Sequence, residues 1–534
     1  MKKNYVKILI IIICFAFVLI VAIKEPEVSF ESETKPEEEV EDGDLIPEDS
    51  VTPEPEAEPI ELVNNPELRV LITTNDFSGD IHNKVKVSSN KDFQLLGEGG
   101  TVFAEYNAWE IVNLDSFGLK TGETLVFQSE GKMSIPSLKR MQGTPEYYGR
   151  IQIYKEESGY SIINIVPMEE YLLTVVPSEM PSNYPLEALK AQAVCARSYA
   201  YHYVVNEPGL PHDAHMNDST DYQVYNNIQE TDATNLAVKE TEGMLLTDEG
   251  VPVSTYFFST SCGFTTNETI WKEYFGGEEW ADGQMPQVAY VTGSETEYKK
   301  TMFEPVAVAQ SQAIETISTN SGVGILYTPD ALTREENFRA YITSDESDFL
   351  EADEQWYRWT YNGTISAERI EERLADRYAA RPDLILTLNA EELNYVNQPI
   401  GGIGTITNIE VKKRLPGGVA DELIIETTKK TYLVIGEYNI RYVLSDGESE
   451  IVRNDGSVVT VSNLLPSAYF IIEPEYASSG TIDRICLTGG GYGHGVGMSQ
   501  NGAKAAALQG MTAEEILHLF YQGLTLKTTN EVQG

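Results

Sequence analysis

The side chain best placed to do chemistry is Glu179, which lies between two prolines in residues 176–181 (VPSEMP). Cleavage of a glycosidic bond requires a protonated carboxyl group beside the leaving oxygen, and a hydrophobic environment raises the pKa of a glutamate enough to supply that proton near neutral pH. Met180, Pro181 and Tyr184 frame Glu179 in this way. The alternative is an exposed loop glutamate, or one that caps the following helix, and the residues alone favour this alternative because a single glutamate is a weak signal.

A second candidate is the glycine-rich stretch 489–500 (GGGYGHGVGMSQ). It lacks the GK[ST] of a phosphate-binding loop, and no strand-GxGxxG-helix unit surrounds it, so nucleotide binding is not expected. Six glycines in its first nine positions let the backbone pass close to a ligand or to another loop. His494 and Gln500 would then supply the polar groups. A tight structural turn with a hydrogen-bonded histidine is the alternative.

Two further groups of polar residues give less specific signals. Four side chains in one turn-rich stretch have a spacing that could hold a metal ion: His212, His215, Asp218 and Asp221. A solvated loop is the commoner form of such a run, and no cysteine stands nearby, so we expect no metal site. Ser259 and Ser261 could be nucleophiles, but the sequence offers no Asp and His in an order that would complete a catalytic triad with them. We expect them to form hydrogen bonds in a groove or at the end of a strand.

The elements that must position these residues follow from local patterns. Apolar and small residues recur at three- and four-residue steps over 185–203, with proline in the first turn, which predicts a packed helix that contains Arg197. Each proline fixes its own φ and favours extended geometry in the residue before it, so we expect Glu179 on a stiff connector outside any helix or strand. A short helix opened by Pro167 leads into that connector.

Strands dominate much of the remaining chain. Apolar runs with β-branched residues predict strands at 68–73, 84–87, 150–154, 160–166, 253–258, 405–412, 422–427, 431–435 and 469–473. Helices are expected at 232–241, at 366–379 and after Gln500, and Thr512 with Glu515 forms the capping box of a last helix. The mixture predicts an α+β fold.

The N-terminal region has a different composition. Residues 8–23 are an unbroken run of sixteen apolar residues after Lys2, Lys3 and Lys7. No small-x-small cleavage site closes the run, so we expect a single-span membrane anchor with the N-terminus inside, a cleaved signal peptide being the alternative. Residues 24–61 contain sixteen acidic residues, two lysines and six prolines, which predicts a disordered, self-repelling linker.

Charge and cysteine content narrow the possible partners. The 534 residues carry a formal net charge of −45, which disfavours binding to a phosphate backbone, so we expect no nucleic-acid partner and a neutral or weakly charged polymer instead. The length exceeds what one ordinary core holds. Four widely spaced cysteines do not indicate a disulfide framework, although a bridge between Cys262 and Cys486 is open, and Cys195 is expected in the core.

Five motifs occur in order along the chain: VVPSEMP, PLEALKAQAVCARSYA, YQVY, STSCGFT and GYGHGVGMSQNGA. Together they resemble the stage II sporulation protein D (SpoIID) family, which shares a domain with the LytB amidase enhancers, and the resemblance extends over about residues 68–526. Family members are membrane-anchored cell-wall proteins. The sporulation members are lytic transglycosylases that cut the glycan strands of peptidoglycan during engulfment.

The resemblance implies roles for single residues. Glu179 would be the catalytic acid, and the substrate-binding residues of its groove would be Arg197, Gln223, Tyr225, Ser261, His494 and Gln500. A lytic transglycosylase can work with one carboxyl group, without a cofactor. Some family members carry a zinc cluster of cysteine and histidine just before QVY, whereas residues 217–222 here read NDSTDY, so we expect no metal ion.

The sequence thus predicts a peptidoglycan lytic transglycosylase that cleaves between N-acetylmuramic acid and N-acetylglucosamine and leaves 1,6-anhydro ends. Its partners would be glycan strands, the cell membrane and a cell-wall amidase. We expect β-rich lobes with packed helices that form a substrate groove. The expected divisions are a cytoplasmic tip and anchor at 1–24, the linker at 25–64, and an extracytoplasmic domain at 65–530, with core motifs in 150–275 and 484–527 and an insertion at about 300–400.

Two alternatives remain at this point. The first is a non-catalytic amidase enhancer that binds peptidoglycan or an amidase. The second is a hydrolase with two carboxylates, in which Asp221 or Glu170 joins Glu179 and the product has a reducing end.

Overall fold

The structure is a computed structural model that describes residues 63–75, 77–206, 209–225, 228–271, 304–309, 327–344, 348–460 and 463–529. The expected membrane anchor and nearly all of the acidic linker lie outside these residues. Within them, no helix has both the length and the apolar character that a membrane crossing requires. The described chain is an α+β protein rich in strands, as the sequence predicts.

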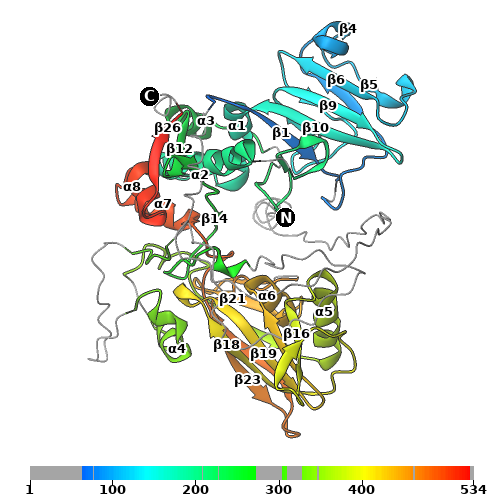
Figure 1. Cartoon of the computed structure of the whole chain (residues 1–534). Helices are drawn as coiled ribbons and strands as arrows, with labels where there is room; N and C mark the ends of the chain where they lie inside the picture. Colours follow the sequence, from blue (N-terminus) through cyan, green and yellow to red (C-terminus); the bar gives the residue numbers. More distant parts are fainter. Residues whose placement is uncertain are drawn as a thin grey trace, which may run out of the picture.

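The first lobe is built on a seven-stranded, mainly antiparallel sheet with the order β11-β1-β10-β9-β6-β3-β4 (Figure 1). Its strands are β1 (Glu67–Ile72), β3 (Phe93–Leu96), β4 (Val102–Tyr106), β6 (Thr124–Ser129), β9 (Arg150–Lys155), β10 (Tyr160–Pro167) and β11 (Met216–Asn217). A smaller sheet contains β5 (Val112–Asn113), β2 (Lys86–Ser89), β7 (Met133–Ser134) and β8 (Glu146–Tyr147). All but the last residue of β10 are buried, which explains its continuous apolar sequence.

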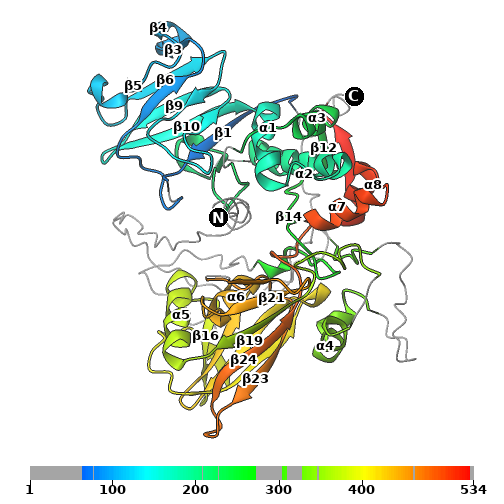
Figure 2. The ribbon, with the colours of Figure 1, turned by 180° about the vertical axis from the view of Figure 1, so that it is seen from behind.

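Helices beside this sheet carry most of the sequence motifs. α1 (Met168–Glu179) follows β10 directly, and α2 (Leu186–Val205) and α3 (Asp232–Glu240) pack against it. α7 (Gln500–Leu508) and α8 (Ala513–Phe520), from the end of the chain, also pack on α2, as Figures 1 and 2 show. The alanines of α2 are buried, so that four helices can approach its backbone closely. A three-stranded sheet completes this region with β13 (Val251–Pro252), β12 (Met244–Asp248) and β26 (Thr525–Thr528).

The second lobe contains two antiparallel five-stranded sheets with the orders β22-β21-β15-β24-β23 and β17-β16-β20-β19-β18. Their strands are β15 (Trp359–Thr364), β16 (Ile385–Asn389), β17 (Asn394–Val396), β18 (Ile406–Arg414), β19 (Ala420–Thr427), β20 (Thr431–Ile435), β21 (Glu450–Arg453), β22 (Val458–Thr460), β23 (Phe470–Tyr476) and β24 (Ile482–Gly489). The helices are α4 (Glu335–Ile342), α5 (Ala367–Ala380) and α6 (Glu437–Leu444). This lobe therefore extends well beyond the insertion expected at about 300–400.

The lobes meet where the chain enters and leaves the second lobe. β14 (Phe257–Phe258) pairs in parallel with β25 (Met498–Ser499), and Thr260 forms a bridge with Tyr492. Only two residues of the strand predicted at 253–258 are in a strand. The junction brings together loop 259–263 and the start of α7, which lie far apart in the sequence.

The three cysteines within the described residues are free thiols. Cys195 lies in the buried face of α2, as expected. Cys262 lies in loop 259–263 and Cys486 in β24. The disulfide that the sequence left open between Cys262 and Cys486 is therefore not formed.

Candidate active site

Glu179 is the last residue of α1, and its side chain is half-buried. The backbone N–H of Val224 donates a hydrogen bond to Glu179 Oε1 at 2.5 Å. Within the described part of the chain, no group donates to the other carboxyl oxygen, Oε2. One oxygen is therefore fixed by the backbone, and the other is available to carry a proton.

Burial raises the pKa of Glu179 from its ordinary value of 4.5 to about 7, and the hydrogen bond from Val224 offsets this only in part. The cause is the loss of water around the carboxylate, which disfavours the charged form. A carboxyl group with a pKa near 7 can both give and accept a proton at neutral pH. Glu179 thus has the property that a general acid requires.

The prediction that Glu179 lies on a connector outside any helix is wrong, because α1 continues through Pro177 to Glu179. Pro177 has no N–H to donate within the helix. The last turn is completed by the Ser178 hydroxyl, which donates to the carbonyl four residues earlier at 2.6 Å, and by the N–H of Met180, which donates to the Val176 carbonyl at 2.9 Å. Met180 is extended, so the helix ends directly after the carboxylate.

Gln500 lies directly beside Glu179. It is the first residue of α7, and the preceding Ser499 caps that helix by accepting a hydrogen bond from the N–H of Gly502. Gln500 Nε2 donates to the backbone carbonyl of Glu179 at 2.9 Å and to Gln192 Oε1 at 3.3 Å. The structure therefore brings two of the predicted site residues together and ties the ends of α1 and α7 to α2.

A row of half-buried polar side chains continues from Gln500 along α7. Asn501 Oδ1 accepts a hydrogen bond from the Tyr184 hydroxyl at 2.6 Å. Lys504 lies over the Tyr184 ring, 5.2 Å from its centroid, and pairs with Glu354 of the second lobe at 2.6 Å. The sequence analysis did not count Asn501 and Lys504 among the site residues, and the available signal was their position one and four residues after Gln500.

A chain of aromatic rings also starts in the segment whose backbone contacts Glu179. The rings follow one another with centroid separations of 4.4–5.8 Å in the order Tyr222, Tyr203, Tyr199, Tyr256, Trp271 and His494. Tyr222 lies two positions before Val224, whose N–H binds Glu179. Most of these rings are half-buried and offer rigid amphipathic surface to a ligand. Sequence analysis missed the chain because its members come from separate segments.

His494 holds the glycine-rich loop and does not offer a free nitrogen. Its Nε2 donates to the Phe257 carbonyl at 3.0 Å, and its Nδ1 accepts from the Val496 N–H at 3.1 Å. Burial lowers the pKa of His494 to about 4, so the ring is neutral. Gly497 has a positive φ, and a Cβ there would lie 2.0 Å from the carbonyl of Tyr256. His494 therefore holds this loop in place, and its expected contact with substrate stays a prediction.

Arg197 lies inside the protein, and its expected contact with substrate stays a prediction. Its side chain is 1 % exposed and forms a bidentate ion pair with Glu169, with Nε at 2.8 Å from Oε1 and Nη2 at 2.7 Å from Oε2. Further hydrogen bonds reach the carbonyls of Val238 and Met244. This buried guanidinium joins α1 to α2 and α3.

The YQVY motif contacts Glu179 through its backbone and not through its large side chains. Gln223 and Tyr225 are 1 % and 0 % exposed. Gln223 Nε2 donates to the Ala196 carbonyl at 3.2 Å, and the Tyr225 hydroxyl donates to Asn164 Oδ1 at 3.0 Å. Both side chains anchor the segment so that the N–H of Val224, between them, reaches Glu179. Gln223 and Tyr225 therefore position this backbone, and their expected substrate contacts stay predictions.

Ser261 is buried, and its partner is Glu351 of the second lobe. The Ser261 N–H donates to Glu351 Oε1 at 2.9 Å, and the Ser261 hydroxyl donates to Oε2. Burial raises the pKa of Glu351 to about 7, and these hydrogen bonds counteract the rise. Ser261 thus contacts Glu351, and its expected contact with substrate stays a prediction. Nothing in the sequence indicates this partner, which lies 90 residues away.

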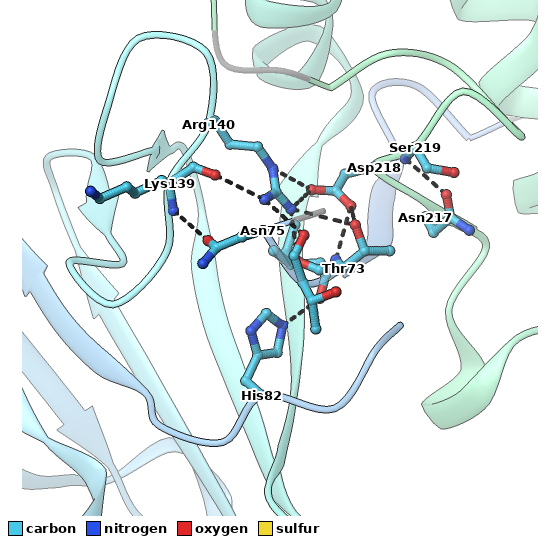
Figure 3. Close-up of polar contacts among 10 residues, drawn as sticks. Thr73, Asn75, His82, Lys139, Arg140, Asn217, Asp218 and Ser219 are labelled. Carbon is cyan, nitrogen blue, oxygen red and sulfur yellow. Dashed lines mark hydrogen bonds and ion pairs between the residues drawn. The ribbon is translucent and has the colours of Figure 1, made fainter. Parts of the chain in front are cut away.

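The histidines and aspartates at 212–221 take part in separate polar contacts. Asp218 is fully buried, pairs with Arg140 at 2.5 Å and accepts a hydrogen bond from the Thr73 hydroxyl at 2.6 Å (Figure 3). His212 Nε2 contacts a glutamate at 2.8 Å, and His215 Nδ1 accepts from a backbone N–H at 3.2 Å. The described ranges contain no group of three or more His, Cys, Asp or Glu side chains arranged to hold a metal ion.

The two carboxylates considered as partners of Glu179 do not act on it. Glu170 lies at the other end of α1, and nine residues of helix separate the two positions by about 13 Å, which exceeds the spacing of both kinds of catalytic pair. Asp221 is exposed. Among the residues that the structure describes, only burial and the Val224 N–H shift the pKa of Glu179, and no second carboxylate there contributes to the shift.

Two family models match the chain. Residues 156–247 match the model described as "Stage II sporulation protein", which covers β10, α1, α2 and α3 and therefore Glu179. Residues 310–497 match a "Domain of unknown function (DUF8618)", which covers the second lobe. Glu179 and His494 thus fall within different family models, whereas Ser261 and Gln500 lie outside both.

The chain is also similar to three curated proteins of bacteria. It is 37 % identical to the stage II sporulation protein D of Bacillus amyloliquefaciens over 169 residues, which are 29 % of this chain and 46 % of that protein. It is 24 % identical to the amidase enhancer of Bacillus subtilis over 358 residues, 66 % of this chain and 39 % of that protein. An uncharacterised protein of Brachyspira hyodysenteriae is 32 % identical over 185 residues, 33 % of this chain and 48 % of its own length. The chain thus spans less than half the length of these relatives.

Proposed function

Since the chain carries a domain of the stage II sporulation protein D family, we propose that it acts on peptidoglycan in the cell envelope as a lytic transglycosylase. The observation that carries the proposal is the state of Glu179. Its carboxyl group is half-buried, has a pKa near 7, and has one oxygen fixed by Val224 and the other available. These are the properties of an acid that protonates a glycosidic oxygen near neutral pH.

The reaction needs only this carboxyl group. Glu179 donates its proton to the oxygen that links C1 of N-acetylmuramic acid to N-acetylglucosamine, and the bond from C1 to that oxygen breaks. The resulting carboxylate then accepts the proton of the C6 hydroxyl of N-acetylmuramic acid as its oxygen bonds to C1. The product is a 1,6-anhydro end, no water is consumed, and Glu179 regains the proton for the next cycle.

The surroundings of Glu179 suit a sugar polymer. The aromatic chain from Tyr222 to Trp271 offers ring surface for the apolar faces of sugar rings, and Tyr184 and Asn501 offer hydroxyl and amide groups for sugar hydroxyls. The formal charge of −45 also disfavours a phosphate polymer. In this account the apolar run at 8–23 anchors the protein in the membrane, and the acidic linker holds the lobes in the wall.

A second candidate function is that of an amidase enhancer, which binds peptidoglycan or a wall amidase without cleaving glycan. The observation that favours it is the relative named for this role, because its match extends over 66 % of the chain, much further than the match to the sporulation protein. In this case the half-buried Glu179 would hold the wall polymer without transferring a proton.

Digestion of purified glycan strands separates the two functions. The full chain in detergent is incubated with peptide-free strands, with and without a wall amidase, and the products are identified by mass spectrometry. Strand shortening with 1,6-anhydro ends in the absence of amidase supports the transglycosylase. Intact strands, together with faster release of peptides when amidase is added, support the enhancer. Reducing ends would indicate a hydrolase.

A further inference from the structure

The buried carboxyl group of Glu351, in the second lobe, contacts elements that adjoin the candidate active site. Glu351 is 0 % exposed, and both of its oxygens are occupied. Oε1 accepts hydrogen bonds from the Ser261 N–H at 2.9 Å and from the Ser499 hydroxyl at 2.5 Å, and Oε2 accepts one from the Ser261 hydroxyl. Glu351 therefore cannot deliver a proton to a sugar, in contrast to Glu179.

The two serines belong to the elements that meet at Glu179. Ser261 lies in loop 259–263, and Ser499 is the N-cap of α7, where its hydroxyl accepts from the Gly502 N–H at 3.2 Å. The Ser261 N–H also lies 3.2 Å from the same hydroxyl. The next residue, Gln500, donates to the Glu179 carbonyl at 2.9 Å. A continuous series of contacts thus leads from Glu351 to the backbone of the catalytic acid.

Other side chains near Glu351 in the sequence hold the same loop. The Tyr341 hydroxyl and Arg358 Nη1 both donate to the carbonyl of Cys262, at 2.5 Å and 2.9 Å. Glu354 pairs with Lys504 of α7 at 2.6 Å. The segment that matches the domain of unknown function lies in the second lobe and therefore contacts both loop 259–263 and α7.

We propose that Glu351 is a positioning residue of the active site, which fixes loop 259–263 and the start of α7 and thereby holds Gln500 against the end of α1. The domain of unknown function is then part of the active site and not an independent module. A buried side chain suits this task when its two oxygens accept three hydrogen bonds, because each partner is then held in one geometry. The catalytic consequence rests on the proposed function, whereas the structural consequence does not.

Three variants of the full chain test the proposal. Glu351→Ala removes all three acceptor contacts, and we expect kcat for glycan cleavage to fall on the order of 100-fold with KM nearly unchanged, because the acid is misplaced while the sugar-binding surface remains. Glu351→Gln keeps an acceptor for both serines and should restore kcat to within about threefold of wild type. Asp353→Asn, which removes an exposed charge two residues away, is the matched control and should behave as wild type.

Hydrogen exchange separates this proposal from the proposed function. The amides of Ser261 and Gly502 should exchange faster in Glu351→Ala than in Asp353→Asn, even if the wild type releases no anhydro ends and the transglycosylase assignment fails. If the alanine variant does not fold, Glu351→Asp replaces it, since the shorter side chain cannot reach both serines. A folded variant with wild-type kcat and wild-type exchange at both amides would overturn the proposal.

Discussion

Replacement of Glu179 by glutamine is the most informative single change. The glutamine side chain has the same shape, and its carbonyl oxygen can still accept the hydrogen bond that Val224 N–H gives to Glu179. It has no acidic proton. The local structure is therefore retained while the chemistry is removed.

The size of the effect follows from the pKa of Glu179. With a pKa of about 7, about half of the molecules carry the proton at pH 7, whereas the ordinary value of 4.5 would leave about 0.3 % protonated. Burial thus increases the reactive population on the order of 100-fold, and general acid catalysis contributes about 10²- to 10⁴-fold. We expect Glu179→Gln to lose cleavage by at least about 100-fold while it still binds glycan.

The same change should make the fold more stable at high pH. Below pH 4.5 the carboxyl group is neutral in both the folded and the unfolded chain, so it has no effect there. Between pH 4.5 and 7 the unfolded chain releases the proton more readily, and stability falls as pH rises, by at most about 3 kcal/mol for this difference in pKa. Glu179→Gln should therefore raise Tm at pH 8 and leave it nearly unchanged at pH 4.

The assay combines digestion of peptide-free glycan strands with thermal melts at the two pH values. Glu170→Gln is the matched control, because Glu170 lies on the same helix at its opposite end. The control should cleave at the wild-type rate. Anhydro products from a folded Glu179→Gln variant at the wild-type rate, or equal melting of that variant and the wild type at pH 8, would refute this reasoning.

Three further outcomes follow from the site. The kcat/KM of the wild type should decline as pH rises above about 7, where Glu179 loses its proton, and a pH profile measures this; a flat profile to pH 9 would contradict it. Arg197→Ala should destabilise the fold by about 3 kcal/mol in urea unfolding, because it leaves the half-buried Glu169 without its guanidinium partner, and unchanged stability would show that the pair is not structural. Tyr222→Ala should weaken glycan binding on the order of tenfold in a strand pull-down with Tm little changed, and wild-type binding would remove this ring from the sugar surface.

Patterns of nearby residues in the sequence predicted the helices and strands whose formation depends on those residues. The alanine periodicity of α2, the apolar run of β10 and the capping box of α8 depend on neighbours within a few residues, and the structure confirms all three. The end of α1 was not predictable in the same way. Its prolines indicate a break, but burial of the helix and the Ser178 hydroxyl let it continue to Glu179.

The roles of single residues were less predictable, because they depend on tertiary partners. Arg197, Tyr225 and Ser261 belong to the motifs that carry the family resemblance, yet each is buried and bonded within the protein. A motif shows that a residue type is required and does not show whether it contacts substrate or another side chain. Glu351 belongs to no motif, and only the fold places it beside Ser261.

The protonation of Glu179 is the claim on which the proposed chemistry depends, and a titration measures it directly. Carboxyl ¹³C signals of the glutamate-labelled chain are followed by NMR from pH 3 to 9, and the signals of Glu179 and Glu351 are identified by their loss in the Glu179→Gln and Glu351→Gln variants. The structure predicts a midpoint near 7 for Glu179. A midpoint near the ordinary value of 4.5 would mean that the carboxyl group is ionised at neutral pH and cannot serve as the acid.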